Sequence, residues 1–179
     1  MRRGTTALTK VMRGTTAIQK IMRGVTTIWQ NWILKTGNLA IMVNNSSPSP
    51  YTCNANNPTV GDAYMVFDNS NATKCEWQYV GHQPIATLFF GAKRIRITNF
   101  NVFVDQSGTS SVTIFLYGIR EDNSEVLIFS GSVSSFASNS RTSVDTETPF
   151  KAVSLRMNPA PAGVVMLHEL QITGWHEQG

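Results

Sequence analysis

The sequence lacks long apolar runs, and its first third lacks acidic residues. No stretch of eighteen or more apolar residues occurs, which argues against a transmembrane helix. No Asp or Glu precedes Asp62. Seven basic residues do: Arg2, Arg3, Lys10, Arg13, Lys20, Arg23 and Lys35. Because the remainder carries eight basic and eleven acidic residues, the sequence predicts a basic arm on a mildly acidic body.

Charged residues and cysteines are also scarce. Charged residues make up 15% of the chain and apolar residues 41%, so a core can form while Ser, Thr and Asn supply much of the surface. This composition favours β-structure. Cys53 and Cys75 lie 22 residues apart without the C-x-x-C spacing of metal sites. Two cysteines leave open whether they pair.

The sequence contains no recognisable catalytic constellation. The three histidines, His82, His168 and His176, are scattered, and no G-x-S-x-G motif is present. Hydrolysis needs a carboxylate pair, a triad or a metal cluster. Glycine and threonine also interrupt the region where a signal peptide would need a continuous apolar segment. We therefore expect a non-enzymatic protein without a secretory signal.

A ten-residue repeat fills the basic arm. Its glycines recur at Gly4, Gly14 and Gly24, and its apolar residues at Leu8, Ile18 and Ile28, before Trp29 and Trp32. Glycine beside β-branched residues and a period of ten disfavour a helix and favour short strands joined at a bend. Three copies of the chain wrapped around one axis would bury the apolar positions, so we predict a trimerisation stalk. The alternative is an unfolded basic arm that orders on a partner.

The repeat also carries a family resemblance over residues 2–34. Its form, ending in "VTTIWQNW", resembles the N-terminal repeats of tailed-bacteriophage virion proteins. The resemblance implies location in the virion and docking on capsid, neck or tail proteins. Nucleic acid is a less favoured partner, because aromatic residues that could stack on bases are not interleaved with the basic ones. The basic residues are explained equally well as the solvated edge of the stalk.

The rest of the chain is predicted to be a linker and a β-domain. Residues 35–61 are rich in Asn, Ser and Pro, which predicts a linker with at most one short strand at Leu39–Val43. From residue 62 to 179, alternating segments such as "RIRITNFNVFV" and "SVTIFLYGI" predict an antiparallel β-sandwich. The predicted strands are Ala63–Phe67, Ile85–Phe90, Arg94–Val104, Ser111–Arg120, Glu125–Val133, Lys151–Met157 and Gly163–Thr173.

Residues 62–175 resemble the galactose-binding-like, or discoidin-like, β-sandwich. The stretches that carry the resemblance are "MVFDNSNATKCEW", "ATLFFGAKRIRITNFNVFV", "TIFLYGIREDNSEVLIF" and "GVVMLHELQITG". The chain departs from the family at Ile119-Arg120, where Gly-Ser is usual. The family's structural calcium implies a site at Asp68, Asn71, Thr73 and Glu169, whose oxygens suit this ion. Alternatively, Asp68 makes an Asx-turn and Glu169 is a surface charge.

The resemblance further implies glycan binding. Sugar sites combine an aromatic platform with polar groups on loops. Trp77, Tyr79 and His82 lie close together, and a folded hairpin would bring Arg94 near them. Alternatively, Trp77 belongs to the core.

Together these features predict a trimeric virion fibre, spike or decoration protein. The repeats would anchor it, and the β-sandwich would project and contact host-surface glycans. One alternative is a purely structural capsid or neck decoration that contacts only virion proteins. A second is a secreted carbohydrate-binding module.

Overall fold

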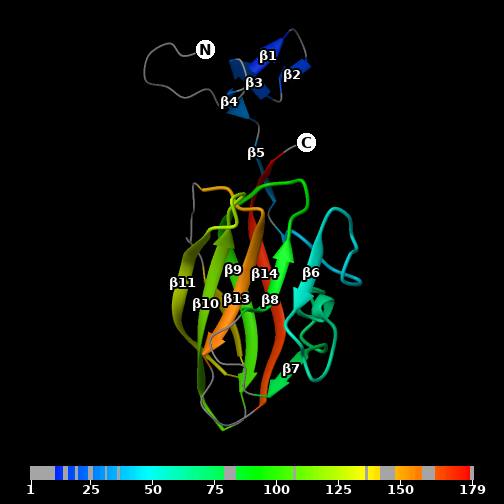
Figure 1. Ribbon diagram of the computed structural model, residues 1–179, viewed down its shortest axis with the longest axis vertical. Helices are drawn as coiled ribbons and strands as arrows, with labels where there is room; N and C mark the ends of the chain where they lie inside the picture. Colours follow the sequence, from blue (N-terminus) through cyan, green and yellow to red (C-terminus); the bar gives the residue numbers. More distant parts are fainter. Residues whose placement is uncertain are drawn as a thin grey trace.

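The structure is a computed structural model that describes residues 11–13, 16–18, 20–23, 26–30, 32–35, 37–78, 84–106, 108–135, 137–141, 148–158 and 164–177. Two antiparallel sheets pack face to face (Figure 1). This confirms the predicted all-β antiparallel sandwich. Among the described residues, no helix has the length and apolar character needed to cross a membrane.

The first sheet has five strands in the order β11-β10-β13-β8-β6. Their bounds are β6 Thr52–Ala55, β8 Pro84–Phe89, β10 Ser111–Ile119, β11 Glu125–Ser134 and β13 Ala152–Asn158. The residues of β10 alternate strictly between buried and less buried positions. Val112, Ile114 and Leu116 therefore face the core, whereas the intervening side chains lie on the outer face of this sheet.

The second sheet is built around β14, Val164–Glu177, which pairs with β9, Ile95–Gln106, along most of its length. β12, Ala137–Arg141, pairs with the other edge of β9. β5, Trp32–Lys35, and β7, Cys75–Gln78, pair with opposite ends of β14. Sequence analysis did not predict β5, β6, β7 or β12 as strands of the sandwich.

Two irregularities bend β14 against β9. The register shifts between Leu167 and Glu169 and again between Thr173 and Gly174. A Cβ atom at Gly174 would collide with the backbone carbonyl of Arg96, so glycine permits the close approach of the two strands there. The first shift lies at Glu169, which thereby departs from the regular alternation of the strand.

The predicted strand at Ala63–Phe67 is wrong. These residues form a 3-10 turn, Ala63–Val66, in which the amide of Met65 donates to the carbonyl of Asp62 at 3.0 Å. Val66 and Phe67 are both fully buried. A strand would point these two neighbouring side chains to opposite faces, whereas a tight turn places both in the core.

The linker predicted at residues 35–61 is also corrected by the structure. Leu39, Ala40, Met42 and Cys53 are buried in the core. Leu39–Val43 forms no strand, although the Leu39 amide donates to the Ile172 carbonyl at 2.8 Å. The polar composition reflects the turns of this segment, while a few apolar side chains are enough to fix it to the sandwich. The division into a stalk and a domain stays a prediction.

The repeat forms two β-hairpins in the described residues. β1, Val11–Arg13, pairs with β2, Thr16–Ile18, and β3, Lys20–Arg23, pairs with β4, Thr26–Gln30. This confirms short strands on either side of each bend. The hairpins lie beyond the end of the sandwich at which β5 and the C-terminus are found (Figure 1). The trimer stays a prediction.

The residues predicted to build the stalk fall into three groups. Gly4, Leu8, Gly14 and Gly24 lie outside the described residues. Ile18 lies in β2, and Ile28 and Trp29 lie in β4. Trp32 belongs to β5, and the guanidinium of Arg96 lies 4.8 Å from the centre of its ring. Trp32 therefore contacts the sandwich.

Candidate functional site

Three of the four predicted calcium ligands converge beside the loop that follows the 3-10 turn. The Asp68 carboxylate accepts hydrogen bonds from the Ser70 amide at 2.9 Å and the Thr73 hydroxyl at 2.6 Å. The Ser70 amide also donates to Glu169 Oε2 at 2.7 Å. One backbone N–H thus lies between two carboxylates that are 101 positions apart in the sequence.

Glu169 is buried, with 1% of its surface exposed, which contradicts the alternative that it is a surface charge. Burial raises its pKa to about 8, the Ser70 amide acts in the opposite direction, and the negative charge of Asp68 raises it further. Its Oε1 atom is buried without a hydrogen-bond partner. A cation would neutralise both carboxylates and occupy the unpartnered oxygen, so this donor set fits a hard, oxygen-seeking ion.

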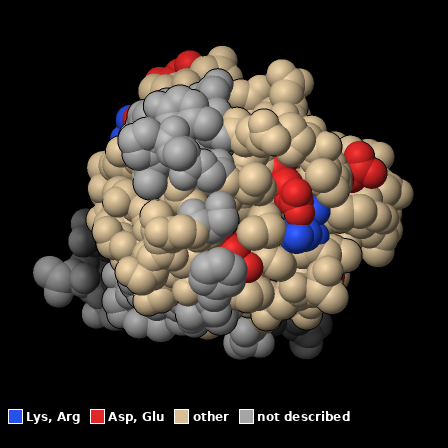
Figure 2. Space-filling model, turned by 90° about the horizontal axis from the view of Figure 1, so that it is seen from below, with Lys and Arg blue, Asp and Glu red and all other residues tan. Residues whose placement is uncertain are grey.

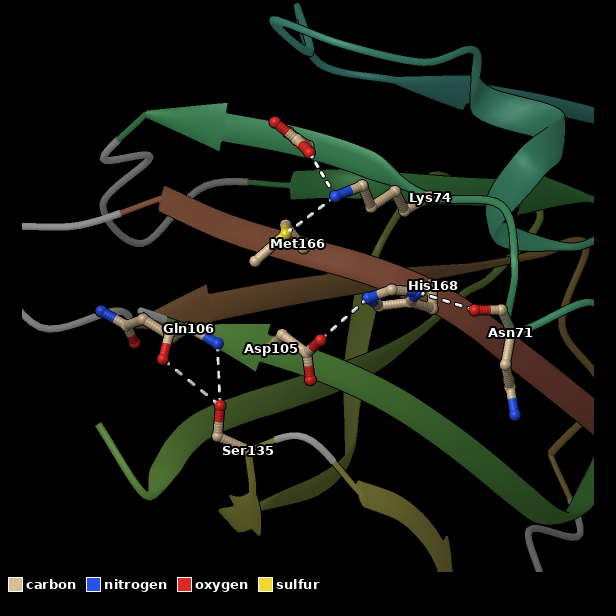
Figure 3. Close-up of polar contacts among 8 residues, drawn as sticks. Asn71, Lys74, Asp105, Gln106, Ser135, Met166 and His168 are labelled. Carbon is tan, nitrogen blue, oxygen red and sulfur yellow. Dashed lines mark hydrogen bonds and ion pairs between the residues drawn. The ribbon is translucent and has the colours of Figure 1, made fainter. Parts of the chain in front are cut away.

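Asn71, which was predicted to offer its side chain to calcium, instead contacts His168 through its backbone. Its backbone carbonyl lies 2.9 Å from Nδ1 of His168, and its side-chain amide points away from the histidine (Figure 3). The Asp68–Ser70 hydrogen bond is the expected Asx-turn. No group of three or more His, Cys, Asp and Glu side chains gathers in the described part of the chain. A cation here would therefore need hydroxyl or carbonyl ligands besides Asp68 and Glu169.

A second buried carboxylate lies on the neighbouring strand. Asp105 Oδ2 is 3.0 Å from Nε2 of His168, and both side chains are nearly buried (Figure 3). The His168 ring also packs against Phe103, with ring centres 4.6 Å apart. Both ring nitrogens face oxygen atoms, so the ring links the 68–73 loop to β9. Sequence analysis missed this pair, because the register that joins β9 and β14 cannot be read from residue spacing.

Lys74 and Met166 lie on the same side of the β7–β14 pair (Figure 3). Lys74 Nζ is 2.6 Å from Glu76 Oε1 and 3.2 Å from the Met166 sulfur. The end of the sandwich that points away from the hairpins carries scattered acidic side chains and little basic surface (Figure 2). Its described surface in this view is mostly uncharged.

Two of the four residues of the predicted glycan site, Trp77 and Arg94, do not lie together in the structure. Trp77 is 1% exposed, and its indole N–H donates to the Asn56 carbonyl at 2.8 Å, so it is a core residue and not a platform. Tyr79 and His82 lie outside the described residues.

Arg94 lies at the other end of the sheet from Trp77. Trp77 pairs with Val165, whereas Ile95, next to Arg94, pairs with His176. Eleven residues of strand separate these positions, which corresponds to roughly 35 Å. Arg94 instead contacts Glu121 at 3.0 Å and Glu177 at 3.7 Å.

The two cysteines are free and buried. Burial raises the pKa of Cys53 to about 11 and that of Cys75 to about 12. The thiol of Cys75 donates to the Asp62 carbonyl at 3.0 Å. Both cysteines therefore act as small core residues.

Comparisons with known proteins place the fold. No protein-family model matches the sequence, and no curated protein is significantly similar to it. Solved structures do match. The family 32 carbohydrate-binding module (CBM) of Clostridium perfringens NanJ, in complex with galactose, is 14% identical with a TM-score of 0.53, covering 69% of this chain and 93% of that one.

Two further structures agree with this match. The CBM32 of AlyQ, in complex with 4,5-unsaturated mannuronic acid, is 12% identical with a TM-score of 0.54, covering 68% of this chain and 92% of that one. CBM32-1 from a family 31 glycoside hydrolase of C. perfringens is 8% identical with a TM-score of 0.57, covering 70% and 95%. The chain therefore has the galactose-binding-like β-sandwich fold that these modules share.

Proposed function

We propose that this protein is a carbohydrate-binding module without catalytic activity of its own. The observation that carries the proposal is the likeness of its whole sandwich to three modules, two of them in complex with sugars. The sequence analysis gave a carbohydrate-binding module as its second alternative. The likeness of the fold to such modules favours this alternative over a purely structural decoration protein.

The proposal is tested by measuring binding of the full chain to a panel of immobilised glycans. A carbohydrate-binding module gives saturable binding that a soluble form of the same sugar competes away. Heat-denatured protein is the control for attraction by the basic arm. Absence of saturable binding to every glycan, with the chain folded, would contradict the proposal.

A structural cation, with calcium as the best candidate, belongs to the same proposal. Asp68, Thr73 and Glu169 would hold it, and the unpartnered Glu169 Oε1 supports this assignment. Bound there, the ion would supply positive charge between two carboxylates and join the 68–73 loop to β14. The role of the ion would be structural, since the carboxylates and the hydroxyl that would hold it already make hydrogen bonds within the fold.

A second candidate function concerns the N-terminal repeats. Two hairpins of similar length follow one another in the arm, which supports a stalk that anchors the sandwich to a larger assembly. The resemblance to phage virion repeats carries the prediction of a trimer in a virion. Light scattering of the full chain tests it: a trimer has a mass of about 59 kDa, three times 19.7 kDa. A 19.7 kDa species would contradict the stalk.

A further inference from the structure

A groove crosses the outer face of the first sheet, β11-β10-β13-β8-β6, near the end at which β8 and β10 finish. Its volume is about 440 Å³. The residues that line it are Thr52, Phe89, Gly91, Ile119, Asn123, Glu125 and Lys151. They come from β6, β8, β10, β11 and the turns beside them, so the groove spans the sheet from one edge to the other.

The strand register explains why these residues meet. Thr52 pairs with Phe89, Phe89 with Ala152, Ala152 with Ile119, and Ile119 with Glu125. These five positions therefore form one row across the five strands. The side chains of Thr52, Phe89, Ile119 and Glu125 line the groove, Ala152 is buried between Phe89 and Ile119, and Lys151 is the residue that precedes Ala152. With strands about 4.8 Å apart, the row is roughly 19 Å long, which is enough for more than one sugar ring.

The floor of the groove is apolar. Phe89 is 37% exposed, so part of its ring faces the groove. Ile119 is half-buried beside it. An exposed aromatic ring next to an aliphatic side chain is the kind of surface on which the C–H face of a pyranose packs.

The polar rim carries one lysine that forms no ion pair within the described residues. Glu125 accepts hydrogen bonds at 2.6 Å from the Arg156 guanidinium, which in turn lies 4.5 Å from the centre of the Tyr117 ring. Lys151 Nζ instead contacts neutral oxygens, Asn123 Oδ1 at 2.6 Å and the Glu121 carbonyl at 3.5 Å. Within the described residues, no carboxylate forms an ion pair with Lys151.

We propose that this groove binds a carboxylate-bearing pyranose of an acidic glycan. The apolar face of the sugar packs on Phe89, and the sugar carboxylate pairs with the Lys151 ammonium. Asn123, which already orients Lys151, and Thr52 are placed to hydrogen-bond the ring hydroxyls. The inference rests on the proposed carbohydrate-binding function and assigns it a place and a substrate class.

The test compares two polymers that differ in charge: polygalacturonate and its fully methyl-esterified form. Affinity electrophoresis of the full chain measures both. We expect tighter binding to polygalacturonate, with a preference that decreases as salt increases. Lys151→Gln removes the ammonium while keeping a hydrogen-bond donor. It should weaken binding to polygalacturonate about tenfold and leave the methyl ester unchanged.

Two further variants complete the design. Phe89→Ala should weaken binding to both polymers, since the apolar platform serves either sugar. Lys93→Gln has the same net charge as Lys151→Gln but does not line the groove. It corrects for non-specific attraction of the basic arm to a polyanion. Melting curves of all three variants confirm that each is folded.

Each outcome has a defined meaning. Equal losses in Lys151→Gln and Lys93→Gln would overturn the ion pair with the sugar carboxylate. Equal binding of both polymers by the native chain would overturn the acidic class. Saturable binding of any glycan that is unaffected by Phe89→Ala and Lys151→Gln would overturn the groove but leave the proposed function intact. Absence of saturable binding to any glycan would overturn both proposals.

Discussion

The regions around Asp105 and Glu169 bury carboxylates on neighbouring strands and stabilise them in different ways. Asp105 Oδ2 lies 3.0 Å from Nε2 of His168, so one carboxylate oxygen faces a histidine side chain. Glu169 Oε2 instead accepts a hydrogen bond from the Ser70 amide, which it shares with the Asp68 carboxylate. Each buried carboxylate also has one buried oxygen without a hydrogen-bond partner, Asp105 Oδ1 and Glu169 Oε1. The second carboxylate beside Glu169 is what favours a cation in that region, because two neighbouring carboxylates shielded from water need positive charge between them.

The largest expected effect on stability comes from breaking the contact between His168 and Asp105. His168→Ala leaves the buried Asp105 carboxylate without its side-chain partner and also removes the hydrogen bond to the Asn71 carbonyl. Leaving a buried charged group without a hydrogen-bond partner typically costs about 3 kcal/mol of unfolding free energy. Urea denaturation measures it. The control is His176→Ala, which changes a half-buried histidine of the same strand whose Nδ1 atom lies 3.3 Å from the Glu177 carbonyl. Similar losses of stability for both variants would show that the contact between His168 and Asp105 contributes no more than an ordinary half-buried histidine.

Calcium should stabilise the fold by binding between the Asp68 and Glu169 carboxylates. Relative to EDTA-treated protein, calcium at 100 times its dissociation constant should stabilise the fold by about 2.7 kcal/mol. The gain should disappear in Glu169→Gln and Asp68→Asn and persist in Asp105→Asn. Thermal melting with and without EDTA measures it. A calcium gain that survives Glu169→Gln would place the ion elsewhere.

The pH dependence of the cation-free protein should separate the two carboxylates. The pKa of Glu169 is raised from 4.5 to about 8 in the folded state, so between these values the folded chain holds a proton that the unfolded chain releases. The unfolding free energy contributed by this group therefore falls as pH rises from about 4.5 to about 8 and then becomes constant. Denaturation in EDTA across this range should show the decrease.

Glu169→Gln is the matching control, because an amide cannot ionise. At pH 8 in EDTA it should be about 1 kcal/mol more stable than the native chain, since it removes a buried charge without a counter-ion. Asp105→Asn should have the opposite sign, because it weakens the hydrogen bond between this side chain and His168. If Glu169→Gln and Asp105→Asn change the unfolding free energy in the same direction, the two carboxylates do not differ in the way described.

The smallest effect should come from the ion pair between Lys74 and Glu76. Its side chains are 37% and 22% exposed, so water screens the attraction. Lys74→Gln should cost about 0.5 kcal/mol and lose that small effect in high salt. Denaturation at two salt concentrations checks it. A cost near that of His168→Ala would mean that exposure does not govern these pairs.

Alternating hydrophobicity predicted the long strands because each has one face in the core. "SVTIFLYGI" shows this pattern, and β10 forms there. β6 and β7 are short and lack a long alternating pattern, so their pairing with β8 and β14 could not be read from the sequence. Trp77 illustrates the same limit: its residue type suits either a sugar platform or a core, and only packing decides.

The candidate cation cluster could be predicted in part. Asp68 and Thr73 lie in one short loop, so their proximity is local. Glu169 joins them only through the family resemblance, because 96 residues separate it from Thr73. The groove on the sheet could not be predicted, since its row of side chains depends on the register of five strands.

The sequence by itself determined the β-class, the two hairpins of the repeat and the contrast between a basic arm and an acidic body. These depend on residue type and local spacing. The tertiary structure decided which distant side chains lie together: His168 with Asp105, Glu169 with the Asp68 loop, and Phe89 and Lys151 along one groove. The reason is physical, because strand register and bulges convert distant positions into neighbours, and burial then determines how strongly their charges interact.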